Sequence, residues 1–539
     1  MPKHTTADNT MRVAIVTLDN HLASTAARVH HELQQQNIQL SLHAAGDWDR
    51  NPQSLQRCHT AIAQADIVVV TMLCMEDHIN AVIDQLRARR DQCDAMVCCM
   101  CAGDVVKLTR MGRFTLDGGD SRAKAFFKRL RSKSSRRKKV KSGKLQMAML
   151  RRVPQILRYI PGTAQDIRQY FLVLQYWLAG SERNISNMVR MLVNTYASDE
   201  RLRDRVNVEL PREYYDVGLY HPRLPDAMAD CPEGMVDRVE ALPAVAGLAS
   251  DSVKGRVGLL LMRSYVLAGN VHHYNAVIDQ LESNGYQVIP GFASGLDARP
   301  VIDQFFVKDG KPVIDVLLSL TGFSLVGGPA YNDASAAEEV LAALDIPYLA
   351  AMGLEFQTLE NWQNSERGLL PVESAMMVAI PELDGALNPM VFGGRSETDA
   401  DTDNGSNGVN KVDMFPQMSQ VTRLTRRVDR LVSLRNSSRA ERRVALVIFN
   451  FPPNSGAVGS AAHLSVFESL YNTLQKMQAS GYTVDLPTDV DELREAVLYG
   501  NAEDYGADAN VTARISADDY VRRETWLDDI EAAWGPAPG

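Results

Sequence analysis

Short apolar runs alternate with amphipathic stretches along the first hundred residues of the chain. The runs RVAIVTL, ADIVVVTMLC and AMVCCM each have the length of a buried strand. Between them, residues 26–36 and 79–89 place apolar side chains at helical spacing. Strands that alternate with helices predict a parallel, doubly wound sheet, so the N-terminal region is expected to be an α/β domain.

The next pattern is helical. Between residues 145 and 197 one apolar face is formed by Ile167, Tyr170, Phe171, Leu174 and Leu178. AGSERN then ends one helix and caps another. Residues 198–255 are rich in proline and irregular, which indicates a connection rather than a core.

Two later segments, 256–290 and 443–487, share one order of features. Each has an apolar run, a loop with Asn and His, an amphipathic helix, and Gly-Tyr-x-Val before a proline. This repetition predicts tandem Rossmann-like or flavodoxin-like βαβ lobes. The polar stretch 396–413 and a basic helix near 421–434 separate them.

The resulting division of the chain has five parts. They are an α/β head domain (1–145), a helical neck and irregular connection (146–255), a first α/β lobe (256–395), a polar insertion with a basic helix (396–440), and the beginning of a second α/β lobe (441–539).

Charge and composition narrow the class of protein. The chain has 539 residues and a net charge of −9, which argues against nucleic acid as the main partner. The exception is Lys128–Lys144, where ten of seventeen residues are basic, and we interpret it as a solvated loop. Apolar runs are too short to cross a bilayer, and adjacent cysteines suit a reducing compartment. We expect a cytoplasmic protein with at most peripheral contact with a membrane.

Candidate binding residues follow three of the apolar runs. Open parallel sheets bind ligands at the carboxyl ends of their strands, and the loops after GLLLM, VLLSL and ALVIF are unusually rich in polar, aromatic and glycine residues. These loops predict a shared cleft, and the alternative is that they are domain-packing turns. The candidates are Arg263, Asn270, His273, Tyr274, Thr321, Gly322, Phe323, Gly327, Gly328, Asn450 and Asn454.

Charged residues add a second group of candidates. Glu355, Glu382, Asp384 and Arg395 lie in GLEFQTLENW and PELDGALNPMVFGGR, where they could face one cavity or form ordinary turns. The thiols Cys98, Cys99 and Cys101 lack the paired spacing of a zinc site, so buried thiols explain them more simply. We assign no catalytic residue and no metal ligand. The sequence has no G-x-x-x-x-G-K-[ST] motif and hence no Walker-type ATP site.

Ten motifs along the whole chain carry a family resemblance. TLDNHLA, MEDH, IPGTAQD, YWLAGSERN, RSYVLAGN, GFASGLDARP, SLTGFSLVGGPAYND, LEFQTL, PELDGALNPMVFGGR and FNFPPNSGAVGSAAHLSVFESL occur in the order found in the large H subunits of magnesium chelatase. The chain resembles that family, whose superfamily includes the large subunit of cobaltochelatase.

The resemblance implies a component of an enzyme. It implies binding of protoporphyrin IX, insertion of Mg²⁺ as a substrate, and AAA+ partner subunits that hydrolyse ATP during (bacterio)chlorophyll biosynthesis. The loop from Thr321 to Gly328 would form part of the cavity wall. A further partner would be the Mg-protoporphyrin methyltransferase, and the protein could lie at the photosynthetic membrane.

Members of the family are much longer than this chain. The resemblance implies that a C-terminal half carries the residues of metal insertion, so we expect the chain alone to be inactive. A truncation, the product of a split gene and a short paralogue stay open. The alternative functions are a non-catalytic porphyrin carrier or scaffold, and a cobaltochelatase subunit.

Overall fold

The computed structural model describes most of the chain between residues 10 and 536. The described residues are 10–18, 20–48, 52–117, 152–198, 207–225, 235–245, 247, 252–327, 332–396, 413–450, 457–459, 461, 463–507 and 510–536. The basic run Lys128–Lys144, Gly328, Asn454 and most of the predicted polar insertion lie outside these ranges. The chain forms two compact units, Met1–Val432 and Ser433–Gly539.

The head domain is built on a six-stranded sheet with the order β2-β1-β3-β4-β5-β6. Its first four strands are parallel, and β5 and β6 add antiparallel pairs at one edge. The strands are β1 (Met11–Thr17), β2 (Ile38–Ala44), β3 (Ile67–Thr71), β4 (Ala95–Cys99), β5 (Arg110–Met111) and β6 (Phe114–Thr115). This confirms the predicted doubly wound domain, although β2 and the helix α2 after it were not predicted.

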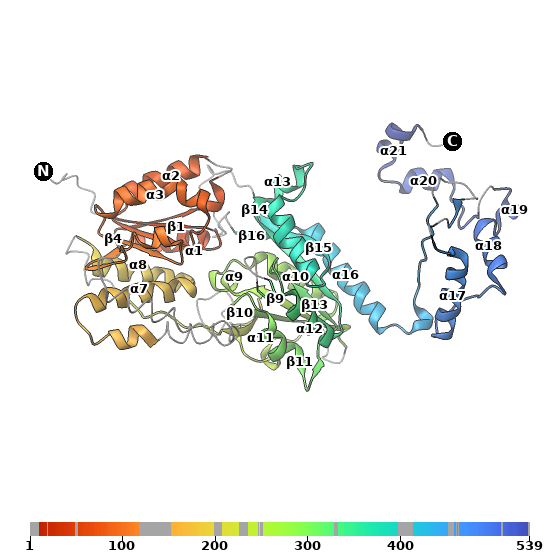
Figure 1. The fold of residues 1–539 in the computed structure, drawn as a ribbon, viewed down its shortest axis with the longest axis horizontal. Coiled ribbons are helices and arrows are strands. Elements are labelled where there is room, and N and C mark those ends of the chain that lie inside the picture. Colours follow the sequence, from red (N-terminus) through yellow and green to blue (C-terminus); the bar gives the residue numbers. More distant parts are fainter. Residues whose placement is uncertain are drawn as a thin grey trace. The chain divides into compact units, whose positions relative to one another are not determined.

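Helices cover both faces of the head sheet (Figure 1). Val13, Ile15 and the alternate residues of β3 and β4 pack against α1, α7 and α8, whereas Ala14 and Val16 face α2 and α3. The parallel strands are therefore apolar on both sides, as buried parallel sheets require. The helices are α1 (Ala23–Gln34), η1 (Ala45–Asp47), α2 (Pro52–Gln64), α3 (Glu76–Arg90), α4 (Gly103–Val106), α7 (Thr163–Leu178) and α8 (Glu182–Tyr196).

The first lobe contains an eight-stranded sheet with the order β16-β15-β14-β13-β9-β10-β7-β8. Five consecutive strands are parallel, and β7, β8 and β16 are antiparallel. Its strands are β7 (Val217–Tyr220), β8 (Met235–Val236), β9 (Gly255–Met262), β10 (Tyr286–Ala293), β13 (Val316–Ser319), β14 (Tyr348–Thr358), β15 (Leu387–Arg395) and β16 (Met414–Pro416). A separate hairpin joins β11 (Val307–Lys308) and β12 (Lys311–Pro312).

The helices of the lobe also lie on both faces of its sheet (Figure 1). One apolar cluster joins the sheet to α10 and α16, and another joins it to η5 and α12. These elements are η4 (Val239–Ala241), α9 (Arg263–Ala268), α10 (His272–Ser283), α11 (Arg299–Val301), η5 (Ile302–Phe306), α12 (Ala334–Leu344), α13 (Leu359–Asn364), α14 (Pro371–Glu373), η6 (Ser374–Ala379), α15 (Ile380–Leu383) and α16 (Met418–Asn436). Helix α16 contains the residues of the predicted basic helix, 421–434.

Both sheets wind in the flavodoxin-like order. In the head domain the parallel strands follow the order second, first, third, fourth, and in the lobe the order is second, first, third, fourth, fifth. Ligands of such sheets bind at the carboxyl ends of the first and third strands, where the winding direction reverses. In the lobe this point lies between β9 and β13.

The second unit does not contain the predicted strand at residues 444–449. This stretch is extended but has no strand partner, and Val447 is 95% exposed. A strand requires a hydrogen-bonded neighbour, and the described residues of this unit supply only the isolated bridge Asn450–Val458. The unit contains the helices η7 (Arg439–Glu441), α17 (Val466–Ala479), α18 (Val490–Leu498), α19 (Ala502–Tyr505), α20 (Ala517–Arg523) and α21 (Leu527–Trp534).

Candidate functional site at the head–lobe junction

The turn after β13 is held rigidly by a buried carboxylate. Asp384 is 1% exposed, and its Oδ2 accepts hydrogen bonds from Ser324 Oγ and Leu325 N, both at 2.7 Å. The hydroxyl of Thr321 lies 2.9 Å from that of Ser319 and also accepts from Phe323 N at 3.4 Å. These hydrogen bonds hold residues 321–325 of the predicted loop at the reversal point of the sheet.

Glycine allows the backbone conformation of this turn. Gly322 has a φ of 69°, a left-handed conformation that glycine adopts readily, and it packs against Met352 on β14. Gly327 has a φ of 126°, and its amide donates to Leu296 O at 3.1 Å. Phe323 is half-buried beside this backbone. The glycines and the aromatic ring of the predicted loop thus lie together at the carboxyl ends of β9 and β13.

Tyr265 links this edge of the lobe to the head domain. Its hydroxyl donates a 2.6 Å hydrogen bond to Glu355 Oε1, on β14. Its ring centroid lies 6.3 Å from that of His21, which precedes α1 of the head domain, and 5.5 Å from that of His273. Three distant segments of the sequence therefore meet around one phenol group.

An ion pair forms a second link across the same junction. Arg395, the last residue of β15, lies with its Nη1 2.7 Å from Oδ1 of Asp47 in the head domain. Asn20 Nδ2 donates to the other oxygen of Asp47 at 2.5 Å. Arg395 pairs with Thr358, the last residue of β14, and Glu355 lies three residues earlier on the same strand.

Helix α1 completes the junction. Thr25 Oγ1 and Arg28 Nη2 each donate to the carbonyl oxygen of Ala268 at 3.0 Å, and Ser24 Oγ donates to Asp413. Burial raises the pKa of the Asp413 carboxyl, partly offset by the hydrogen bond from Ser24. The carboxyl edge of the lobe sheet therefore faces the turn between β1 and α1.

Several predicted residues lie in the packed interior instead. Arg263 donates to the backbone carbonyls of Tyr215 at 2.8 Å and Tyr214 at 3.3 Å, which anchors the irregular connection. Asn270 Oδ1 accepts from Met414 N at 2.8 Å. The polar groups of Arg263 and Asn270 therefore stabilise the fold, and these contacts account for both side chains without a ligand.

His273 and Tyr274 also belong to this interior. The ring of His273 stacks on Phe392 at 5.6 Å, and Tyr274 Oη accepts from Met262 N at 3.3 Å. Burial, assisted by the neighbouring His272, lowers the pKa of His273 to about 3, so this imidazole is neutral at physiological pH. Burial raises the pKa of Tyr274 above its usual value.

The remaining predicted residues do not join the junction. Glu382 is exposed, whereas Asp384 two residues later is buried. Asn450 lies in the second unit, and Gly328 and Asn454 lie outside the described residues.

Among the junction residues that were not predicted from the sequence are Asn20, His21, Asp47 and Tyr265. Three of them lie inside the motifs TLDNHLA and RSYVLAGN, so the motifs contained the signal. Asp47 lies in no such motif, and only the fold brings it to Arg395.

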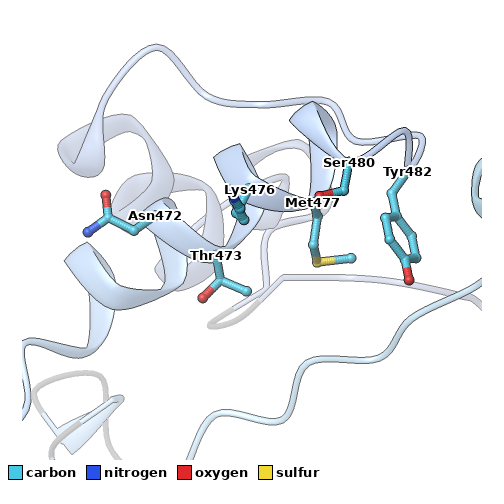
Figure 2. Close-up of a pocket in the computed structure, with 6 residues that line it drawn as sticks. All are labelled: Asn472, Thr473, Lys476, Met477, Ser480 and Tyr482. Atoms are coloured by element: carbon cyan, nitrogen blue, oxygen red, sulfur yellow. The ribbon is translucent and has the colours of Figure 1, made fainter.

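The second unit contains a shallow hollow along α17 (Figure 2). It is lined by Asn472, Thr473, Lys476, Met477, Ser480 and Tyr482. No predicted site residue lines it, and these side chains offer one cation and several hydroxyl groups but no carboxylate.

The thiols of the head domain fit the simpler interpretation. Cys98 and Cys99 are fully buried, and burial raises the pKa of both, to about 12 for Cys99. Among the described residues, no group of three or more His, Cys, Asp or Glu side chains could hold a metal ion. No helix in those ranges is long and apolar enough to span a membrane.

Fold and junction together define an α/β protein in which two flavodoxin-like sheets meet around a polar and aromatic site. A family model described as CobN/Magnesium Chelatase matches residues 174–539, and a domain of unknown function (DUF3479) matches residues 12–171. The chain belongs to the CobN/Magnesium Chelatase family.

Individual relatives agree with this assignment. The magnesium-chelatase H subunit of Cereibacter sphaeroides is 47% identical over 98% of this chain and 44% of its own length. The magnesium-chelatase protein ChlH of Oryza sativa subsp. indica, which is chloroplastic, is 33% identical over 89% of this chain and 34% of its own. The aerobic cobaltochelatase protein CobN of Sinorhizobium is 28% identical over 52% of this chain and 22% of its own.

A solved structure has the same fold. The catalytic subunit of cobaltochelatase from Mycobacterium tuberculosis aligns with a TM-score of 0.53 and 19% identity, over 98% of this chain and 36% of that one. The chain spans less than half the length of the chelatase proteins that it matches.

Proposed function

We propose that this chain is the N-terminal part of a porphyrin-binding H subunit of magnesium chelatase, which takes part in inserting Mg²⁺ into protoporphyrin IX. The observation that carries the proposal is 47% identity to a magnesium-chelatase H subunit over nearly the whole chain. The junction between head and lobe supports it, because a defined turn, an aromatic ring and charged side chains meet where α/β sheets bind ligands.

The chemistry of the reaction explains which groups are needed. Mg²⁺ holds its water shell tightly and prefers oxygen ligands, so its transfer to pyrrole nitrogens is costly. Two ring N–H protons must also leave, which requires a positioned base. In this chain, the half-buried Phe323 would contact the flat face of the macrocycle, and the Tyr265–Glu355 pair would lie at its edge.

Energy for the reaction would come from AAA+ partner subunits that hydrolyse ATP, because the chain has no Walker-type motif. Movement of the head domain relative to the lobe would open and close the junction. The methyltransferase that follows chelation remains a proposed partner, as does the remainder of the H subunit.

A titration with deuteroporphyrin IX, followed by quenching of protein fluorescence, tests this proposal. We expect saturable binding that weakens several-fold in Phe323→Ala. The control is Tyr159→Ala, because Tyr159 is 82% exposed in the neck and would reveal non-specific stacking. Equal loss in both variants would contradict the placement of the site, and no binding to the wild-type chain would contradict the proposal for this part of the protein.

The cobaltochelatase branch is the second candidate, supported by the 28% identity to CobN. A hydrogenobyrinic acid derivative distinguishes the two substrates. We expect it to compete poorly with deuteroporphyrin IX, and a stronger interaction with the corrinoid precursor would favour this second candidate.

A further inference from the structure

The ion pair between Arg395 and Asp47 leaves part of the arginine unsatisfied. The side chain of Arg395 is 14% exposed and that of Asp47 is 34% exposed, so the pair is partly shielded from water. Arg395 Nη1 contacts one oxygen of Asp47 at 2.7 Å, whereas Arg395 Nε is buried without a hydrogen-bond partner among the described residues. The described residues of the head domain thus supply an acceptor for Nη1 of this guanidinium but none for its Nε.

A guanidinium group can donate more hydrogen bonds to a carboxylate than Arg395 donates to Asp47. It has five N–H donors in a planar fork, and carboxylates often take two of them in parallel. A buried donor without an acceptor is unfavourable, by about 1–3 kcal/mol in typical cases. Any carboxylate that reaches both Nε and an Nη group of Arg395 would remove this deficit.

The position of Arg395 places it at the edge of the sheet where a ligand of the junction would lie. It is the last residue of β15, at the carboxyl edge of the sheet, and the neighbouring strand β14 carries Glu355. Glu355 is engaged by Tyr265. Of these groups, Arg395 is the one whose charge favours an anionic substituent of the ligand.

Asp47 belongs to a different domain from Arg395. It ends η1 in the head domain, and Asn20 Nδ2 orients its second oxygen at 2.5 Å. Because 348 residues separate the two partners, the pair forms only when head and lobe are docked. A ligand carboxylate that took over Arg395 would therefore remove one contact of the docked state.

We infer that Arg395 binds a carboxylate of the ligand that occupies the head–lobe junction, and that Asp47 holds the same guanidinium in the absence of ligand. Ligand and head domain then compete for one arginine, so binding loosens the junction. The inference rests on the proposed function for the identity of the ligand, a porphyrin with free propionate groups.

Two porphyrins and four variants of the full chain, one of them a control, test this inference. Deuteroporphyrin IX has two free carboxylates, and its dimethyl ester has none, so the pair isolates the carboxylate contribution in the same detergent solution. Asp47→Asn is expected to tighten binding of the diacid about two- to fivefold, the range of one partly exposed ion pair. The ester should bind Asp47→Asn and the wild type equally.

Changes at Arg395 should have the opposite effect. Arg395→Gln is expected to weaken binding of the diacid about tenfold or more, because a charge-assisted pair is lost. The affinity for the ester should be unchanged. Arg395→Lys retains the charge without the fork and should give an intermediate loss. This second variant keeps the test usable if Arg395→Gln does not fold, which circular dichroism would show.

The matched control is Asp117→Asn. Asp117 pairs with Arg90 at 2.6 Å within the head domain, with side chains 46% and 18% exposed, but takes no part in the junction. It should change binding of neither porphyrin. Equal effects of Arg395→Gln on diacid and ester, or weaker diacid binding in Asp47→Asn, would overturn the inference and make Arg395 a structural tether.

A second readout separates this inference from the proposed function. Succinate, a small dicarboxylate, should raise hydrogen exchange in residues 20–48 of the wild type but not of Arg395→Gln. If neither porphyrin binds but succinate has this effect, the proposed function fails and the inference stands. If succinate has no effect and the porphyrin affinities do not depend on the carboxylates, the inference is wrong.

Discussion

The hydroxyl group of Tyr265 donates a 2.6 Å hydrogen bond to Glu355, ninety residues further along the chain. Tyr265 lies in α9, directly after β9, and Glu355 lies on β14; β13 separates the two strands in the sheet. A contact over this span fixes α9 and β14 on either side of the Thr321–Phe323 turn. It therefore contributes to the shape of the junction as well as to stability.

Removal of this hydrogen bond tests its energetic contribution. Tyr265→Phe keeps the ring contacts with His21 and His273 but removes the donor. We expect the free energy of unfolding to fall by about 1 kcal/mol, since Glu355 is partly exposed and can be solvated. Urea unfolding measures it, with the exposed Tyr505→Phe as control. An unchanged midpoint in Tyr265→Phe would show that the bond adds no stability.

Asp384 should matter more than its neighbour Glu382. Asp384→Asn replaces a buried acceptor of two hydrogen bonds with an amide, and we expect a loss of about 2–3 kcal/mol together with faster hydrogen exchange in residues 321–327. Glu382→Gln, at an exposed position, should stay within about 0.5 kcal/mol of the wild type. Similar losses in both variants would contradict the proposed rigid turn.

Close backbone packing makes Gly393 irreplaceable in β15. A Cβ atom there would meet the carbonyl oxygen of Phe415 at 2.6 Å and Cβ of His273 at 3.2 Å. Gly393→Ala is expected to lower stability by more than about 2 kcal/mol, because backbone must shift. Gly103→Ala is the control, since nothing lies within 4 Å of its Cβ position. Thermal unfolding of the two variants should separate them clearly.

Burial of neutral His273 predicts a loss of stability in acid. Its folded pKa of about 3 lies below the unfolded value near 6.5, so between these values the unfolded chain binds a proton that the folded chain does not. Stability should therefore fall by up to about 1.4 kcal/mol per pH unit as the pH decreases from 6.5 towards 3.

The variant His273→Phe isolates this contribution. Its free energy of unfolding should depend less steeply on pH between 6.5 and 4, whereas His43, with a pKa lowered to about 4 by burial, still titrates in the head domain. Urea titrations at four pH values measure both slopes. An identical slope in wild type and variant would mean that His273 is protonated in the folded protein.

The doubly wound head domain could be predicted from sequence because its parallel strands are apolar on both faces. The strand Ile38–Ala44 was missed because it mixes Gln, Ser and His with apolar residues. The opposite error occurred at residues 444–449, where an apolar pattern alone predicted a strand. The apolar residues of a segment indicate that it can be buried. Whether the segment forms a strand also depends on a neighbouring strand, which the local sequence does not reveal.

The turns in the loop Thr321–Gly327 could be predicted, because Gly322 and Gly327 are local signals and both have a positive φ. The same prediction included His273 and Tyr274. Their rings pack against Phe392, which lies on a strand far away in the sequence. Arg395 was a candidate by itself, but its pairing with Asp47 could not be predicted, since only the fold brings Asp47 to it.

The hydrogen bond between Ser24 and Asp413 joins residues separated by 389 positions. The core of the head domain includes α7 and α8, so it can assemble only after Tyr196 has been made. Ser24 then lacks its partner until Asp413 is made, roughly 220 residues later, about 10 to 45 s at usual rates of translation. A chaperone that shields the face of helix α1 during this interval would determine how much of the newly made protein reaches its docked form.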